Sequence, residues 1–211
     1  MSAPPGDAAG FCAGLVREFD FTRYASTLFV TPDARRALLA LYAFNVEIAR
    51  VHEHIRQPIA GEIRLQWWTD MLAGQGQGYV EGSPVAAELM RAIERYGLPV
   101  ERLTRLIEAH QFDLYNDPMP DIDALDSYAQ DTSSALFDLG ARIAGASPDA
   151  LPEVARQAGI ADTYMHVVTR LPFDASWRQL YLPRDVLAAQ GSSVDEVFAG
   201  RMTPAPRAAL D

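Results

Sequence analysis

The 211-residue sequence contains no lysine, so all 18 of its basic residues are arginine. This absence excludes a Schiff-base lysine and a P-loop lysine on a phosphate. Cys12 is the single cysteine, which excludes an intramolecular disulfide and a multi-cysteine zinc site. Asparagine occurs only at Asn45 and Asn116, whereas alanine occurs 33 times. We attribute the missing lysine to codon bias in a GC-rich genome.

Long apolar runs and positive charge are also scarce. No stretch approaches the roughly 20 apolar residues that a membrane span needs, and the N-terminal MSAPPGDAAG lacks the basic and apolar regions of a secretory signal. A net charge of −10 argues against broad electrostatic binding to nucleic acid. We therefore expect a cytoplasmic protein without a transmembrane segment or a nucleic-acid partner, with peripheral contact at the inner membrane as its closest approach to lipid.

Helical periodicity and helix-boundary residues are abundant. Thr31 and Pro32 predict a helix start, and the apolar stripe that follows them continues at helical spacing to Ile55. Pro58 predicts the start of the next helix, and Gly97 predicts the end of a helix that begins near Val85.

The second half of the chain shows the same pattern. Pro99 predicts a helix that reaches about Tyr115, and a long helix is expected from about Ile122 to Gly145. Pro152 opens another helix, which Pro172 is expected to stop after Arg170 or Leu171. Because no alternating strand pattern of useful length is present, the prediction is one all-α domain.

The two ends differ in composition from the middle of the chain. Residues 1–9 are small and proline-rich and are expected to form a disordered tail. Residues 10–200 are expected to form the folded domain, and residues 201–211 a second, unpacked tail.

Four segments of the sequence resemble the squalene/phytoene synthase family. They occur in the family's order: ALYAFNVEIARVHE at 40–53, IRLQWW at 63–68, YAQDTSSALFDLG at 128–140 and YLP at 181–183. The resemblance implies an isoprenoid-synthase-like helical bundle around a central cavity. Family members usually continue for several helices beyond YLP, so a fold that lacks the last C-terminal helices, with the cavity open on one side, is expected.

Enzymes of the family join two prenyl diphosphates between two acidic clusters that hold Mg²⁺. The metal ions take oxygen ligands and offset the charge that develops as the diphosphate leaves. The first acidic motif falls on Ala49, Arg50 and Glu53, of which only Glu53 is a carboxylate. We therefore expect no cofactor, and Mg²⁺ only if other carboxylates rebuild a site.

The second acidic motif of the family is degenerate as well. It should follow Arg170, but its first aspartate falls on Leu171, and Asp174 lies near the place of its last aspartate. Pro172 is expected to break the helix that would present this cluster. No catalytic residue and no metal ligand is therefore assigned.

A narrower resemblance, in FNVEIARV and SYAQDTSSALFDL, is to the branch that contains a mitochondrial complex I assembly factor. That branch lacks the aspartate clusters. The resemblance implies a non-catalytic protein that binds a partner protein, an isoprenoid or a lipid, with a role in respiratory complex I assembly. The alternative is an active prenyl-diphosphate transferase, of the squalene/phytoene synthase type, with a displaced Mg²⁺ site. A third reading is a structural helical module whose cavity is filled by side chains.

Individual residues leave alternatives open. Arg50 either binds an anionic head group directly or forms an ion pair with Glu47 or Glu53. Further candidates for anion or ligand binding are Arg64, Arg178 and Tyr181.

Three histidines are expected to play no part in a site. His52 and His54 flank Glu53, and because positions two apart on a helix point to different sides, both are expected to be exposed. His166, four residues before Arg170, either faces the cavity or is a core histidine, and of the two we expect a core histidine.

Overall fold

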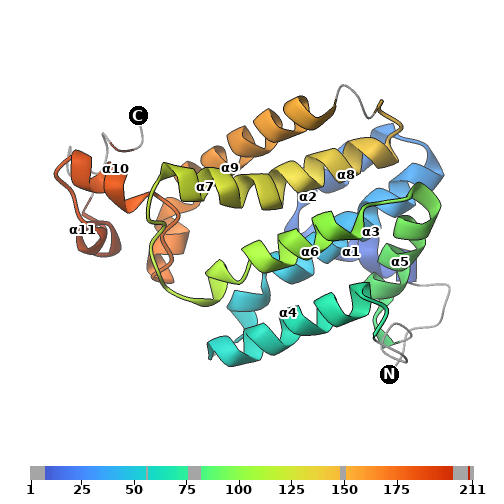
Figure 1. The fold of residues 1–211 in the computed structure, drawn as a ribbon, viewed down its shortest axis with the longest axis horizontal. Coiled ribbons are helices and arrows are strands. Elements are labelled where there is room, and N and C mark those ends of the chain that lie inside the picture. The colour runs from blue at the N-terminus through green and yellow to red at the C-terminus, as the bar shows by residue number, and fades with distance from the viewer. Residues whose placement is uncertain (1–7, 56, 76–81, 148–150, 202–208, 210–211) are drawn as a thin grey trace.

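The computed structural model describes residues 8–55, 57–75, 82–147, 151–201 and 209 of the chain. Among these residues the regular elements are all helical (Figure 1). The α-helices are α1 (Ala8–Phe19), α2 (Phe21–Ser26), α3 (Pro32–Ala49), α4 (Pro58–Leu72), α5 (Pro84–Tyr96), α6 (Val100–Ala109), α7 (Ile122–Ala129), α8 (Ala135–Ile143), α9 (Leu151–Ser176), α10 (Arg184–Ala189) and α11 (Val194–Phe198). The all-α prediction is confirmed.

The expected helix boundaries hold where proline and glycine set them. Pro32, Pro58 and Pro84 each occupy a first-turn position, where the missing N–H costs no hydrogen bond. Gly97 closes α5 in the left-handed conformation, with φ of 58°. Thr31 is the N-cap of α3, although its side chain makes no capping hydrogen bond.

Helix α3 ends earlier than its apolar stripe predicts. It stops at Ala49, Arg50 is the C-cap residue, and a 3₁₀ helix follows at Val51–His54. The change of helix type does not interrupt the packing, because Val51 in the 3₁₀ helix is still buried in the core. The consequence for the site is that Glu53 lies on a tighter turn than α3 would have given it.

The helix expected from about Ile122 to Gly145 contains an irregular turn at its centre. Helices α7 and α8 lie end to end beside α9 (Figure 1), and the π-helical segment Gln130–Ser134 joins them. In this segment Thr132 Oγ1 donates to Tyr128 O at 2.6 Å, and Ser134 Oγ donates to Arg156 O of α9 at 3.0 Å. Such hydroxyl bonds to carbonyl oxygens accompany local departures from α-helical geometry.

Helix α9 does not stop at Pro172, so that expectation is wrong. The helix continues to Ser176 with Pro172 inside it. Proline removes only one backbone donor, and Leu171 on the inner face is buried in the second apolar cluster, which favours continuation of the helix over a break.

The apolar core has two parts. The larger part surrounds α3 and includes α1, α4, α5, α6 and α8. A smaller part lies beneath the end of α9 and includes α10 and α11. None of the described helices is both long enough and apolar enough to cross a bilayer.

The expected tails need one correction. Ala8 and Ala9 belong to α1, so helical structure begins before residue 10. Residues 1–7, 202–208, 210 and 211 lie outside the described residues, and Ala209 packs against the smaller part of the core.

Candidate functional site

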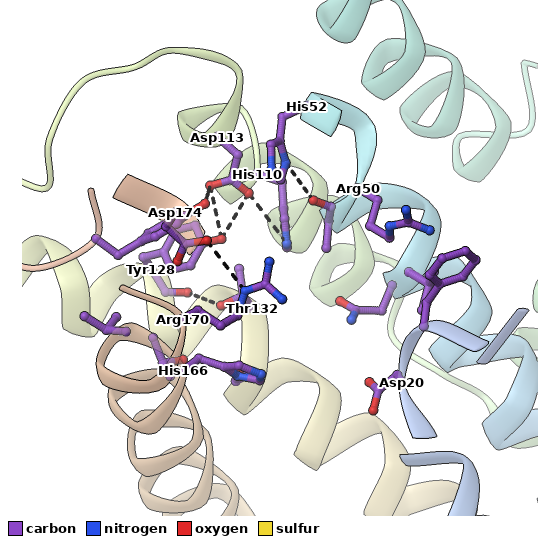
Figure 2. A pocket seen from close by; sticks show the side chains of 18 of the residues that line it. Asp20, Arg50, His52, His110, Asp113, Tyr128, Thr132, His166, Arg170 and Asp174 are labelled. Carbon is purple, nitrogen blue, oxygen red and sulfur yellow. Dashed lines mark hydrogen bonds and ion pairs between the residues drawn. The ribbon is translucent and has the colours of Figure 1, made fainter. Parts of the chain in front are cut away.

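A cavity of about 440 Å³ opens between α3, the centre of the α7–α8 pair and α9 (Figure 2). The start of α2 and the turn after α6 complete its wall. Its polar lining consists of Asp20, Arg23, Asn45, Arg50, His52, Glu53, His110, Asp113, Tyr128, Thr132, Ser133, Thr163, His166, Arg170, Asp174 and Tyr181. The cavity is therefore not filled by side chains, contrary to the reading of this chain as a purely structural module.

All three positions of the first acidic motif line this cavity. Ala49 offers a methyl group, and the Arg50 guanidinium forms an ion pair with Glu53 at 2.7 Å. The same guanidinium lies over the ring of Phe19, 3.6 Å from its centroid. Glu47, the other partner considered for Arg50, instead accepts from Arg64 at 3.1 Å.

Of the residues assigned to the second motif, Arg170 and Asp174 line the cavity and Leu171 does not. Leu171 points into the smaller core and is 6% exposed, whereas Asp174 lines the cavity. Arg170 approaches Asp174 at 3.6 Å and lies 4.6 Å from the centroid of the Phe173 ring. Burial raises the pKa of Asp174, and the charge of Arg170 opposes that rise.

A third acidic centre, Asp113, lies at the inner end of the cavity and was not expected. The 3₁₀ turn Phe112–Leu114 presents its carboxylate, which accepts from Tyr181 Oη at 2.7 Å and from Tyr128 Oη at 3.1 Å. His110 Nε2 is 4.0 Å from it. The sequence signal was a lone aspartate between two large apolar residues.

Burial dominates the electrostatics of this centre. It raises the pKa of the Asp113 carboxyl, with His110 and the Tyr181 hydroxyl opposing the rise. Burial, reinforced by the nearby Asp113 carboxylate, holds the pKa values of Tyr128 and Tyr181 well above their usual value. Both phenols therefore remain protonated and serve as donors at neutral pH.

Replacing Asp113 with asparagine is expected to flatten the pH dependence of stability. Because the folded-state pKa is raised, the folded wild type gains protons, and therefore stability, as the pH falls from neutral through that pKa towards the unfolded-state value. Urea unfolding should show the stability of the wild type rising relative to that of Asp113→Asn as the pH falls from neutral into the acid range. A difference between the two that stays constant with pH would contradict this view of Asp113.

Two histidines expected elsewhere line the cavity. His52 is half-buried, because the 3₁₀ turn after α3 rotates it inward, and its Nδ1 donates to Ala49 O at 2.9 Å. His166 lies on the exposed edge of the cavity rather than in the core. The expectation of an exposed His52 and a core His166 was wrong, whereas His54 is exposed as expected.

Two of the four candidate ligand-binding residues lie away from the cavity. Arg64 lies on α4, where it pairs with Glu47 of α3, and Arg178 follows the end of α9, where it stacks on the Phe198 ring at 4.9 Å. Tyr181 does reach the cavity, because a backbone hydrogen bond from Met119 N to Leu180 O, 2.9 Å long, holds its segment in place.

The carboxylates of the cavity do not fit a cluster of magnesium ions. Each already has a partner: Asp20 is 2.7 Å from Arg23, Glu53 pairs with Arg50, Asp174 with Arg170, and Asp113 with two tyrosines. Magnesium requires several free oxygen ligands in near-octahedral geometry. Within the described part of the chain, no group of three or more His, Cys, Asp or Glu side chains is placed to hold a metal ion.

One residue of the cavity wall carries an unsatisfied hydroxyl. Thr163 Oγ1 is buried and has no hydrogen-bond partner among the described residues. An unsatisfied buried hydroxyl costs about 1–3 kcal/mol, and the burial of this oxygen leaves it almost no surface with which to meet a ligand.

Sequence comparison shows relatives of two kinds. The chain is 29% identical over 190 residues to "NADH dehydrogenase (ubiquinone) complex I, assembly factor 6" of Rattus norvegicus, covering 90% of this chain and 57% of that protein. It is 26% identical over 201 residues to "Phytoene synthase 2, chloroplastic" of Solanum lycopersicum, covering 91% of this chain and 64% of that one. The chain thus spans less than two thirds of the length of these relatives.

Solved structures show the same fold. Squalene synthase HpnC from Alicyclobacillus acidocaldarius superposes with a TM-score of 0.79 at 21% identity, covering 99% of this chain and 79% of that one. A dehydrosqualene synthase superposes with a TM-score of 0.83 at 11% identity, covering 98% and 71%. The squalene/phytoene synthase profile matches residues 16–211. The chain therefore belongs to the squalene/phytoene synthase family.

Proposed function

We propose that this chain is a family member without synthase activity that binds an isoprenoid or a related lipid in its cavity and acts in assembly of the respiratory NADH dehydrogenase. The observation that supports the proposal most directly is the Arg50–Glu53 ion pair, with Ala49 beside it, where the synthases present metal-binding aspartates. A guanidinium cannot ligate Mg²⁺, and it occupies the one carboxylate left in that motif.

The chemistry of prenyl transfer explains why this substitution matters. Ionisation of a prenyl diphosphate needs positive charge on the leaving group, which metal ions supply in these enzymes. In this cavity three arginines are the fixed cations, and each is already paired: Arg23 with Asp20, Arg50 with Glu53, and Arg170 with Asp174. Binding without ionisation is the outcome that this charge arrangement favours.

The cavity is nevertheless suited to an amphipathic ligand. Its wall combines apolar side chains, among them Val46, Leu136 and Val167, with polar side chains. At about 440 Å³ its volume is in the range of ligand sites. An isoprenoid chain would lie against the apolar wall, and a polar head group would lie beside the Arg50–Glu53 and Arg170–Asp174 ion pairs.

The assembly role is drawn from the relatives named as assembly factors of complex I. In this chain such a role would be performed in the cytoplasm, with peripheral contact at the inner membrane, and would depend on a partner protein.

The direct test has two arms. Organic extraction and native mass spectrometry of the purified protein should reveal a bound isoprenoid or lipid. Incubation with farnesyl or geranylgeranyl diphosphate and Mg²⁺ should yield no squalene, phytoene or cyclopropyl intermediate. Formation of any of these products would refute the proposal and establish the chain as a transferase with a displaced metal site.

Filling the cavity is expected to abolish ligand binding. Ala49→Phe places a ring where the wall now has a methyl group, so affinity for the extracted lipid should fall by at least about tenfold. Ala161→Phe, on the exposed surface of α9, is the matched control and should bind as the wild type does. Titration by intrinsic fluorescence, with thermal unfolding of both variants, checks this; equal affinities would place the ligand elsewhere.

A further inference from the structure

Helix α4 is apolar on two opposite faces. Its inner face, with Leu65, Trp68 and Leu72, is buried in the larger core. On its outer face Ile59 and Ile63 are 56% and 66% exposed. Trp67 follows at the same four-residue spacing; it is half-buried, because it also packs against the larger core and meets the Trp68 ring edge-on. A surface helix normally has a single apolar stripe. In this second stripe, which is about 12 Å long by helical rise, Ile59 and Ile63 remain exposed among the described residues.

The outer stripe of α4 forms one side of a groove. Ile59, Ile63 and Trp67 line this groove, which has a volume of about 640 Å³ and ends against Gln111, in the turn after α6. The groove is separate from the cavity between α3, the α7–α8 pair and α9, because no residue lines both sites. In Figure 1 α4 lies at the edge of the bundle, away from α9.

The charges along the groove have one sign. Glu62 and Asp70 line it, and none of the described residues that line it is basic. Asp70 accepts from Gln66 at 2.7 Å, and Glu62 accepts from the Tyr115 hydroxyl; within the described part of the chain neither carboxylate has a cationic partner. The groove thus offers an apolar floor flanked by uncompensated negative charge.

We propose that this α4 groove is a docking site for a basic amphipathic helix of a partner protein. Apolar residues of that helix at positions i, i+3 or i+4, and i+7 would pack on Ile59, Ile63 and Trp67. Lysine or arginine beside them would meet Glu62 and Asp70, which steers association and fixes the orientation of the helix.

The charge of the groove favours this occupant over two others. A second copy related by a two-fold axis would bring Glu62 and Asp70 of both chains to one interface, where like charges repel. A membrane with anionic lipids would repel the same carboxylates.

The α4 docking site specifies where a partner protein would bind. It rests on the proposed function only for the identity of that partner. The two fail separately, because loss of cavity binding in Ala49→Phe leaves the α4 groove unchanged. Conversely, substitutions on the outer face of α4 leave the cavity unchanged.

Fluorescence polarisation with the full chain tests the docking site. The probe is a fluorescein-labelled amphipathic helical peptide of leucine and lysine, and its comparison is the same peptide with glutamate in place of lysine. The lysine peptide should bind and the glutamate peptide should not. Ile63→Ser should weaken the lysine peptide by about tenfold or more, and Asp70→Asn should reduce the salt dependence of its binding.

The matched control is Val154→Ser on α9, because Val154 and Ile63 are both 66% exposed. Val154→Ser should bind the lysine peptide as the wild type does, and both variants should unfold at the wild-type temperature. Equal weakening by the two substitutions, or equal binding of the two peptides, would overturn the proposal. Self-association or anionic-vesicle binding that Ile63→Ser abolishes would also overturn it, by assigning the face to a second copy or to a membrane.

Discussion

Replacing Gly159 with alanine is expected to destabilise the protein by more than about 3 kcal/mol, as severe overpacking does. Gly159 lies on α9, where a Cβ would overlap the backbone N and Cα of Ser134 in the π-helical segment. Because the overlap is with backbone, no side-chain rotation relieves it. Helix α9 would have to move away from the segment that places Thr132 and Ser133 in the cavity wall. Chemical denaturation should show the loss, and lipid affinity should fall with it.

Gly14 provides the control for this prediction. It lies in α1, where a Cβ would meet nothing within 4 Å. Gly14→Ala should raise stability by about 1 kcal/mol, because alanine is the better helix former. If Gly159→Ala also proved stabilising, the close contact of α9 with the π-helical segment would be wrong.

Replacing Arg36 with methionine is expected to cost about 3 kcal/mol, because it leaves the Glu88 carboxylate buried without its main partner. Glu88 is 3% exposed, and Arg36 binds it through two hydrogen bonds of 2.6 and 2.8 Å. Arg91 remains 3.8 Å away and compensates only in part. Urea unfolding at neutral pH measures the loss.

The pH dependence of this effect has a definite sign. The hydrogen bond from Arg36 lowers the pKa of Glu88, so the pair stabilises the wild type above the unfolded-state pKa and is lost as the pH falls through the folded-state value. The difference between wild type and Arg36→Met should therefore shrink in acid. Arg95→Met, which breaks the exposed 2.6 Å pair with Asp33, is the control and should have little effect on stability, because solvent screens that pair. A comparable loss of unfolding free energy in both variants would contradict the view that Glu88 is a buried carboxylate that depends on Arg36.

The helical fold follows from local signals in the sequence. Proline at the first turn of α3, α4 and α5 and glycine after α5 act through the backbone of a few neighbouring residues, so they are readable without tertiary information. Pro172 shows the limit of such reading. Its local effect predicts a break, but burial of Leu171 in the smaller core keeps α9 continuous to Ser176.

The site was only partly predictable, because some of its residues are brought together by tertiary packing. Ala49, Arg50, Glu53 and Asp174 could be placed by resemblance, because they lie within or close to recognisable segments. Asp113 could not, because its chemistry depends on Tyr128 and Tyr181, which lie 15 and 68 residues away along the chain. The inward position of His52 arises where α3 gives way to a 3₁₀ turn, and helical spacing does not foresee that change.

The sequence by itself determined that every fixed cation is an arginine, and it predicted an all-α chain with few carboxylates where the resemblance places the aspartate clusters of the family. Only the tertiary structure decided how the remaining carboxylates are used. Each cavity carboxylate was paired by a side chain that packing brings within reach, whether it lies three residues away, as Arg50 does from Glu53, or 68 residues away, as Tyr181 does from Asp113. The sequence gives the number of charged side chains. Whether each of them is paired or available to a ligand depends on distances of a few ångströms, which only the folded structure determines.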